Sequence, residues 1–121
     1  MNNSLKFFFF LISNLIRGEQ TRDLSTLSNI DEITTNHIHL NLTVNFEKQL
    51  IEGSALLNFT TIKKTQDVFL DMVALNIDKV NLINPDKTSK KLKFSVDNPK
   101  PFLGQRLKIK LPDVVDSLDT F

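Results

Sequence analysis

The sequence predicts an all-β fold, an antiparallel sandwich or saddle of hairpins that is incomplete at its C-terminal end and follows a short apolar N-terminal segment. Apolar and polar residues alternate strictly from His37 to Phe46. Shorter strand-like runs recur after this stretch, with turn residues between them. No stretch repeats its apolar residues every 3.6 positions, so the pattern favours strands over helices.

The stretch from His37 to Phe46 is the clearest strand. Successive side chains of a strand point to opposite faces, so the alternation places five apolar residues on one side. These residues are Ile38, Leu40, Leu42, Val44 and Phe46. We expect this row to face inward and to be buried, and the polar row between them to face water.

A turn at residues 47–49 is expected to lead into a second strand over residues 50–62. Gly53 within that strand predicts a bulge or a bend. Further strands are predicted at residues 68–71, 75–83, 91–96 and 106–111. Residues 84–87 and 97–101 carry turn chemistry between the later strands.

Pro112 is expected to end the last strand, because proline cannot donate a hydrogen bond to a ladder. Residues 113–121 show no repeating pattern, so the last strand has no predicted neighbour. Unpaired sheet edges are a liability that complete domains usually protect. The sequence is therefore interpreted as a truncated piece, or as a domain that leans on something that follows it.

Residues 1–20 are set apart as an apolar extension or a candidate signal peptide, ahead of a β domain over residues 21–121. Lys6 precedes an apolar run from Phe7 to Ile16, which is the layout of a secretory signal. Residues 16–18 lack the small-x-small cleavage pattern, however, and a ten-residue helix of about 15 Å is too short for a bilayer of ~30 Å. The alternatives are an upstream extension or a mis-assigned start. Residues 20–36 are polar and predict an irregular lead-in.

The composition excludes several classes of function. Fifteen basic and fourteen acidic residues leave a net charge of +1, and the lysines are scattered, so nucleic acid is not an expected partner. There is no cysteine, which excludes a disulfide framework, a thiolate metal site and a cysteine nucleophile. No Gly-x-Ser-x-Gly elbow frames any serine, so a hydrolase triad has no support.

Three features could mark a site, and each has a plainer interpretation. His37 and His39 share one strand face and could chelate a metal, but they are more simply two solvent-facing polar positions. Asn2, Asn41 and Asn58 begin glycosylation sequons, which arise easily by chance in an asparagine-rich chain. The lysines within residues 87–93 are expected to form a solvated hairpin.

Five segments, taken in order, resemble the zinc aminopeptidases of the leukotriene A-4 hydrolase type. They are RDLSTLSN (22–29), HIHLNLTVNF (37–46), IEGSA (51–55), VFLD (68–71) and LNIDKV (75–80). The resemblance runs from about Arg22 to the C-terminal end. It implies the first part of the saddle-shaped N-terminal β domain of these metallopeptidases, truncated before the catalytic domain.

The resemblance places the chemistry of that family outside this sequence. Its zinc is held by a His-Glu-x-x-His helix and a downstream glutamate, and a Gly-Gly-Met-Glu-Asn segment binds the substrate amine; none of these motifs occurs here. We therefore expect no catalytic, cofactor-binding or metal-binding residue, no enzyme activity from this chain alone, and zinc only in the full-length family. The implied partners are a catalytic metallopeptidase domain, in cis if the protein is full length, and peptide substrates; nucleic acid and membranes are not expected.

Two functions remain open at this stage, and a third alternative is a degenerate or mis-assigned gene product with no function of its own. The first is a non-catalytic N-terminal domain that packs on a catalytic domain and helps to form the peptide-substrate cleft. The second is a stand-alone secreted β-sandwich binding module, which would carry glycans at Asn41 or Asn58. The family resemblance favours the cytoplasm, and residues 1–17 favour export.

Overall fold

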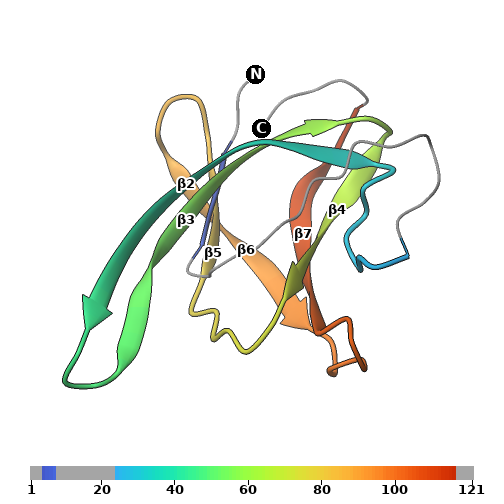
Figure 1. Ribbon diagram of the computed structural model, residues 1–121. Helices are drawn as coiled ribbons and strands as arrows, with labels where there is room; N and C mark the ends of the chain where they lie inside the picture. The colour runs from blue at the N-terminus through green and yellow to red at the C-terminus, as the bar shows by residue number, and fades with distance from the viewer. Residues whose placement is uncertain (1–3, 8–23, 117–121) are drawn as a thin grey trace.

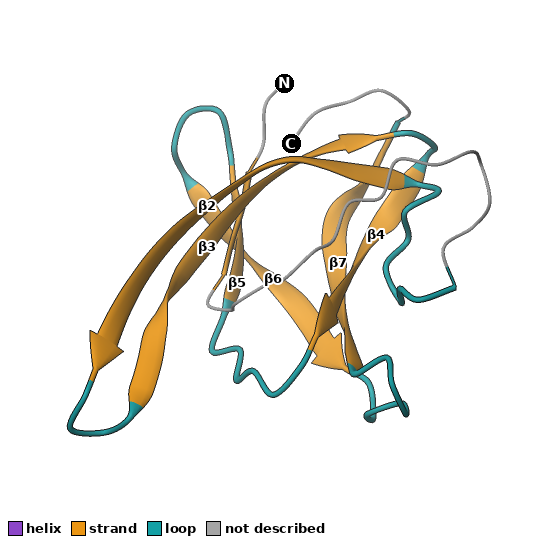
Figure 2. Ribbon diagram, in the orientation of Figure 1, coloured by secondary structure: helices purple, strands orange, loops and turns teal. Residues whose placement is uncertain are grey.

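A computed structural model describes residues 4–7 and 24–116, and every regular element among them is a strand joined by loops (Figure 1, Figure 2). The strands are β1 (Ser4–Phe7), β2 (Ile33–Asn45), β3 (Leu50–Thr61), β4 (Thr65–Met72), β5 (Val80–Ile83), β6 (Ser89–Val96) and β7 (Gln105–Val115). All paired strands are antiparallel, which confirms the all-β prediction. Within the described ranges, no helix is long and apolar enough to cross a membrane.

The seven strands form one curled sheet in the order β2-β3-β1-β5-β6-β7-β4. The long β2–β3 hairpin makes up one side of the molecule, and β6, β7 and β4 make up the opposite side (Figure 1). The largest fully buried side chains come from both sides, and they include Leu57, Phe59, Val68, Leu107 and Ile109. These residues belong to one cluster, so the sheet buries its inner face by curling onto itself.

The β2–β3 hairpin confirms the first two predicted strands, but β2 begins at Ile33, so residues 33–36 are strand and not part of the irregular lead-in that was predicted to reach residue 36. The bulge expected at Gly53 is absent from the described pairing. Its register runs from the Ile33–Thr61 pair to the Asn45–Leu50 pair, and the irregularity lies between Thr35 and His37. Gly53 pairs with Leu42 without a bulge. The glycine is needed there for a different reason, because a Cβ atom at position 53 would lie 2.0 Å from the Asn41 carbonyl oxygen.

The strand predicted over residues 75–83 is shorter than expected. Only Val80–Ile83 is paired, between β1 and β6. Ala74 has a positive φ of 52°, so the chain leaves the extended conformation just after β4. Leu75 and Ile77 nevertheless pack against the core, which explains why this irregular segment carries the apolar spacing of a strand.

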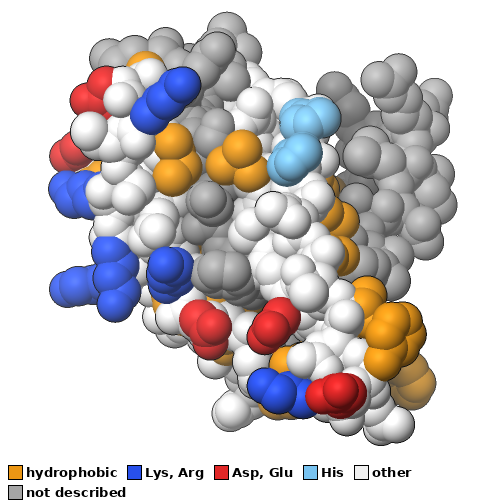
Figure 3. Space-filling model, turned by 90° about the vertical axis from the view of Figure 1, so that its left-hand side faces the viewer, with side chains coloured by type: hydrophobic (Ala, Val, Ile, Leu, Met, Phe, Trp, Pro, Cys, Tyr) orange, Lys and Arg blue, Asp and Glu red, His pale blue; other side chains and the backbone are white. Residues whose placement is uncertain are grey.

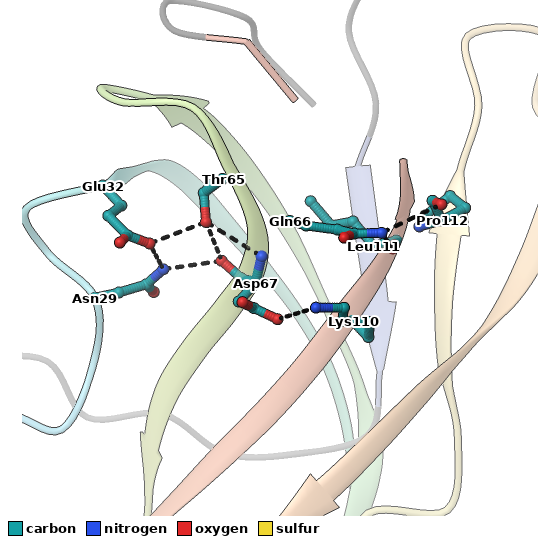
Figure 4. Close-up of polar contacts among 8 residues, drawn as sticks. All are labelled: Asn29, Glu32, Thr65, Gln66, Asp67, Lys110, Leu111 and Pro112. Atoms are coloured by element: carbon teal, nitrogen blue, oxygen red, sulfur yellow. Dashed lines mark hydrogen bonds and ion pairs between the residues drawn. The ribbon is translucent and has the colours of Figure 1, made fainter. Parts of the chain in front are cut away.

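Pro112 does not end the last strand, which continues to Val115. The pairing of β7 with β4 is irregular at this point: Lys110 lies opposite Asp67, and Val115 lies opposite Thr65. Proline is tolerated at such an irregularity, because no regular ladder bond is needed from its nitrogen. The Gln66 side chain instead donates to the carbonyl oxygens of Leu111 at 3.1 Å and of Pro112 at 3.4 Å (Figure 4).

The prediction that the last strand lacks a neighbour is also wrong. β7 lies between β6 and β4 and is paired on both sides. The sheet edges are instead β2 and β4, because β4 joins β7 rather than the strands beside it in sequence. This pairing could not be read from the order of the strands along the chain.

The outer edge of β4 is covered by the irregular lead-in over residues 24–32 (Figure 4). The Asn29 amide accepts a hydrogen bond from the Phe69 backbone N–H at 2.9 Å and donates one to the Asp67 carbonyl oxygen at 2.8 Å. It also donates to Glu32 Oε2 at 2.9 Å, and the Thr65 hydroxyl donates to the same oxygen at 2.9 Å. One asparagine side chain therefore takes the place of a neighbouring strand along part of this edge.

The described part of the N-terminal segment belongs to the sheet. Ser4–Phe7 forms β1, with its backbone paired to β3 on one side and to β5 on the other. The remaining residues of the predicted extension, and with them the cleavage region and the sequon at Asn2, lie outside the described residues.

Candidate docking surface

The outer half of the β2–β3 hairpin is a two-stranded ribbon that projects from the rest of the sheet (Figure 1). β1 pairs with residues Ala55–Asn58 of β3, whereas residues 50–54 of β3 pair, among the described strands, with β2 alone. Two-stranded ribbons are at best marginally stable alone in water. This half of the hairpin therefore lacks the support that its base receives from the neighbouring strands.

One face of the ribbon is apolar and open to solvent. Cross-strand pairing places Leu40 opposite Ala55, Leu42 opposite Gly53 and Val44 opposite Ile51 on this face. The four large side chains, which we call the hairpin strip, are Leu40, Leu42, Val44 and Ile51, with exposed fractions of 38, 37, 51 and 59%. Phe46, at the turn beyond them, is 87% exposed.

This exposure corrects the expectation that the whole apolar row from Ile38 to Phe46 is buried. Ile38, at the base, packs against the core, but the row becomes exposed from Leu40 onward. The reason is that the hairpin is longer than the sheet beside it, so the core ends before the row does. Apolar residues gathered on one exposed sheet face are typical of surfaces that meet another protein body.

Gly53 lies in the middle of the strip and shapes it. The backbone of β2 lies where a side chain at position 53 would be, because an added Cβ atom would lie 2.8 Å from Leu42 Cα as well as close to the Asn41 carbonyl. Glycine therefore allows β2 and β3 to approach closely beneath the larger apolar groups of the strip.

The opposite face of the hairpin is polar and carries both histidines. His37 and His39 are exposed, and they lie opposite Asn58 and Leu56. Figure 3 shows the histidine side chains next to each other on this surface. Across residues 4–7 and 24–116, no group of three His, Cys, Asp or Glu side chains is placed to hold a metal ion. Zinc sites use three or four protein ligands, and the two histidines by themselves supply two.

The two described sequons differ in exposure. Asn41 is exposed on the polar face of β2, whereas Asn58 is half-buried on β3. Only Asn41 therefore has open space for a glycan. The lysines at positions 90, 91 and 93 lie on β6 and are exposed, as expected for a solvated hairpin.

The base of the hairpin is fixed to the rest of the molecule through Glu32. Its carbonyl oxygen accepts hydrogen bonds from the backbone N–H groups of Ile62 at 2.6 Å and Lys63 at 3.2 Å, so the start of β2 is tied to the end of β3. Its carboxylate binds Asn29 and Thr65 beside β4. The hairpin strip is thus held at one end by a fixed base and extends away from it.

An all-strand scaffold that leaves one apolar sheet face uncovered has the character of a structural domain that works against another body. Residues 34–119 match the Peptidase M1 N-terminal domain. The chain therefore belongs to this family, as the N-terminal domain of an M1-type metallo-aminopeptidase.

Proteins similar to this chain include fungal aminopeptidases. Leucine aminopeptidase 2 of Saccharomyces cerevisiae (strain YJM789) is 33% identical over 91 residues, which cover 72% of this chain and 13% of the relative. The enzymes of the same name from Candida glabrata and Pyricularia oryzae are 31% and 30% identical, over 83% and 79% of this chain and 15% of each relative. The chain thus spans roughly a seventh of the length of these relatives.

Proposed function

We propose that this chain serves as a non-catalytic N-terminal domain of a zinc aminopeptidase of the leukotriene A-4 hydrolase type. In this role the hairpin strip packs on the catalytic domain, and the β domain helps to form the cleft that receives peptide substrates. The observation that carries the proposal is the exposed apolar face of the β2–β3 hairpin, made by Leu40, Leu42, Val44 and Ile51.

The chemistry of the strip supports packing rather than catalysis. Its four side chains carry no titratable or nucleophilic group, and burial of such side chains contributes about 25 cal/mol per Å² of apolar surface. The full length of the relatives supports a catalytic domain in cis, since the segment that matches this chain covers only 13% and 15% of them. Zinc and the peptidase activity belong, in this proposal, to the catalytic domain.

The cytoplasm is the proposed location, in keeping with the aminopeptidase role. The exposed sequon at Asn41 makes this testable, because a chain routed through the secretory pathway would have an accessible acceptor there. We expect the mass of the native polypeptide to show no glycan at Asn41 or Asn58. A glycan at Asn41 together with a processed N-terminus would instead support the secreted binding module.

The docking role can be tested in a chimera. The segment of Saccharomyces cerevisiae leucine aminopeptidase 2 that matches this chain is replaced by the corresponding residues of this chain, and hydrolysis of a leucyl fluorogenic substrate is measured. We expect the chimera to be soluble and active. We also expect Leu42→Asp to lower the yield of active enzyme at least about tenfold, because a carboxylate would be buried in an apolar interface.

Asn41→Asp is the matched control, since it places the same carboxylate one residue away on the exposed polar face, opposite Ser54. We expect this variant to retain the activity of the chimera. Equal losses for Leu42→Asp and Asn41→Asp would contradict docking through the strip.

A further inference from the structure

A basic groove lies on the outer face of β4, β6 and β7, on the other side of the sheet from the core. It has a volume of about 340 Å³, and its charged and polar lining residues are Asp67, Lys93, Ser95, Lys108 and Lys110, with the Phe69 ring beside them. Val68, Leu107 and Ile109, which alternate with these residues along the strands, are buried in the core. The groove therefore faces away from the core, and it involves no residue of the hairpin strip.

The register of the three strands arranges these side chains in two rows. Lys93 of β6, Lys110 of β7 and Asp67 of β4 form one row, because Lys110 pairs with both neighbours. Ser95, Lys108 and Phe69 form the adjacent row in the same way. Each row therefore carries a lysine in its centre, with Phe69 beside Lys108.

The charges in the first row are not balanced. Lys110 Nζ lies 3.1 Å from Asp67 Oδ1, and Lys108 Nζ lies 3.1 Å from Asp97 Oδ1. Lys93 has no acidic partner in the described part of the chain, and it lies directly opposite Lys110. Like charges facing each other across a ladder are destabilising, so an anion placed between the two ammonium groups would be favourable.

The second row adds an apolar wall. The Phe69 ring is half-buried, and the Arg106 guanidinium lies 4.8 Å from the ring centroid. Phe69 is held in place through its backbone N–H, which donates to Asn29. A ligand that reaches from Lys93 and Lys110 toward Lys108 would thus meet an aromatic side chain beside the second charge.

We infer that this groove binds an extended acidic peptide segment, with one carboxylate between Lys93 and Lys110 and a second near Lys108. Alternate residues of a strand are about 6.8 Å apart, and alternate side chains of an extended peptide have the same spacing. Carboxylates at positions i and i+2 of the peptide therefore match Lys110 and Lys108. Asp67 and Asp97 flank the central lysines, which disfavours a continuous polyanion such as a nucleic acid.

The test is fluorescence anisotropy of the 121-residue chain with a labelled peptide that alternates Glu and Ser. The comparison probes are the same peptide with Gln in place of Glu, and labelled oligothymidylate. We expect saturable binding of the Glu peptide that weakens with salt, and little binding of the other two. Absence of saturable binding of the Glu peptide, or tighter binding of oligothymidylate, would overturn the inference.

Variants localise the binding to the groove. Lys93→Gln should weaken binding of the Glu peptide at least about fivefold, because a charge-assisted hydrogen bond is lost. Ser95→Glu, which places a carboxylate opposite Lys108, should abolish binding while leaving the melting temperature of the chain in place. Lys90→Gln removes the same charge from the other face of β6, and it should leave the affinity unchanged. Equal loss of affinity for the Glu peptide in Lys90→Gln and Lys93→Gln would show that binding depends on net charge alone, and it would overturn the inference.

Discussion

At position 53 the backbones of β2 and β3 approach so closely that only glycine fits. We expect Gly53→Ala to destabilise the chain by about 1–3 kcal/mol, because the added methyl group would meet the Asn41 carbonyl and Leu42 Cα. Urea denaturation measures the difference. Ser54→Ala, on the other face of the same strand, is the control and should change the free energy of unfolding little. A Gly53→Ala variant as stable as the wild type would show that the strands separate freely there.

A second feature at the residue scale is the pH response of Asp97. A hydrogen bond from Lys108, with a further contribution from Arg106, holds the pKa of Asp97 below its ordinary value of 3.8. A carboxyl group whose pKa is lowered by folding stabilises the native state above its unfolded pKa, and this stability is lost as the pH falls through the folded pKa.

Asp97→Asn should therefore be less stable than the wild type at pH 7, and the difference should shrink as the pH falls below 3.8. Urea denaturation at pH 7, 5 and 3 follows this change. Asp113→Asn, at an exposed position on β7, is the comparison and should show a smaller difference at pH 7. A stability difference between Asp97→Asn and the wild type that stays constant down to pH 3 would contradict a stabilising role for the lowered pKa of Asp97.

At the scale of the element, the strands differ in how their edges are protected. β4 has its outer edge covered by Asn29, whereas no strand in the described part of the chain pairs with the outer edge of β2, which is thirteen residues long. Asn29→Ala removes one acceptor and one donor from the β4 edge and should destabilise the chain by about 1–3 kcal/mol. It should also raise the tendency to aggregate, because an uncovered strand edge pairs with other chains.

Asn36→Ala is the matched control for this variant. Asn36 is exposed and its side chain donates to Thr60 Oγ1, so its loss should change the free energy of unfolding by less than about 0.5 kcal/mol. Thermal melts and light scattering compare the two variants. Equal stability and equal scattering of Asn29→Ala and Asn36→Ala would exclude a protective role for Asn29.

The elements also show which parts of the fold could be predicted from the sequence. The part of β2 from His37 onward was predictable, because the alternation of side chains follows from the pleat of the strand itself. Its first residues, 33–36, were predicted to be irregular, because they are polar apart from Ile33 and lack the alternation. The exposure of Leu40 and Val44 was not, because a row of apolar residues looks the same whether or not another element covers it. Residues 75–79 were predicted to be strand but are irregular. Leu75 and Ile77 pack against the core, so apolar residues at alternate positions occur there without a strand.

At the scale of the whole molecule, strand pairing depends on contacts that are distant in sequence. β4 pairs with β7, and β1 lies between β3 and β5. Neither pairing could be predicted from a local pattern in the sequence. The two surfaces with proposed roles depend on this topology. The hairpin strip is exposed because β2 and β3 extend beyond the strands beside them. The basic groove forms because β4, β7 and β6 lie side by side.

The two surfaces lie on different parts of the sheet, so their roles can be separated. Substitutions in the hairpin strip should leave binding of the acidic peptide unchanged. Substitutions in the basic groove should leave assembly of the aminopeptidase chimera unchanged.

The central claim, that the hairpin strip is covered by a catalytic domain, is tested most directly by thiol labelling at position 44. The chain contains no cysteine, so Val44→Cys introduces a single thiol whose labelled peptide can be followed by mass spectrometry. We expect this thiol to react rapidly with a maleimide in the isolated chain and at least about tenfold more slowly in the aminopeptidase chimera. A thiol at position 41, on the polar face, should react at similar rates in both. Equal labelling of Val44→Cys in the isolated chain and in the chimera would contradict the claim.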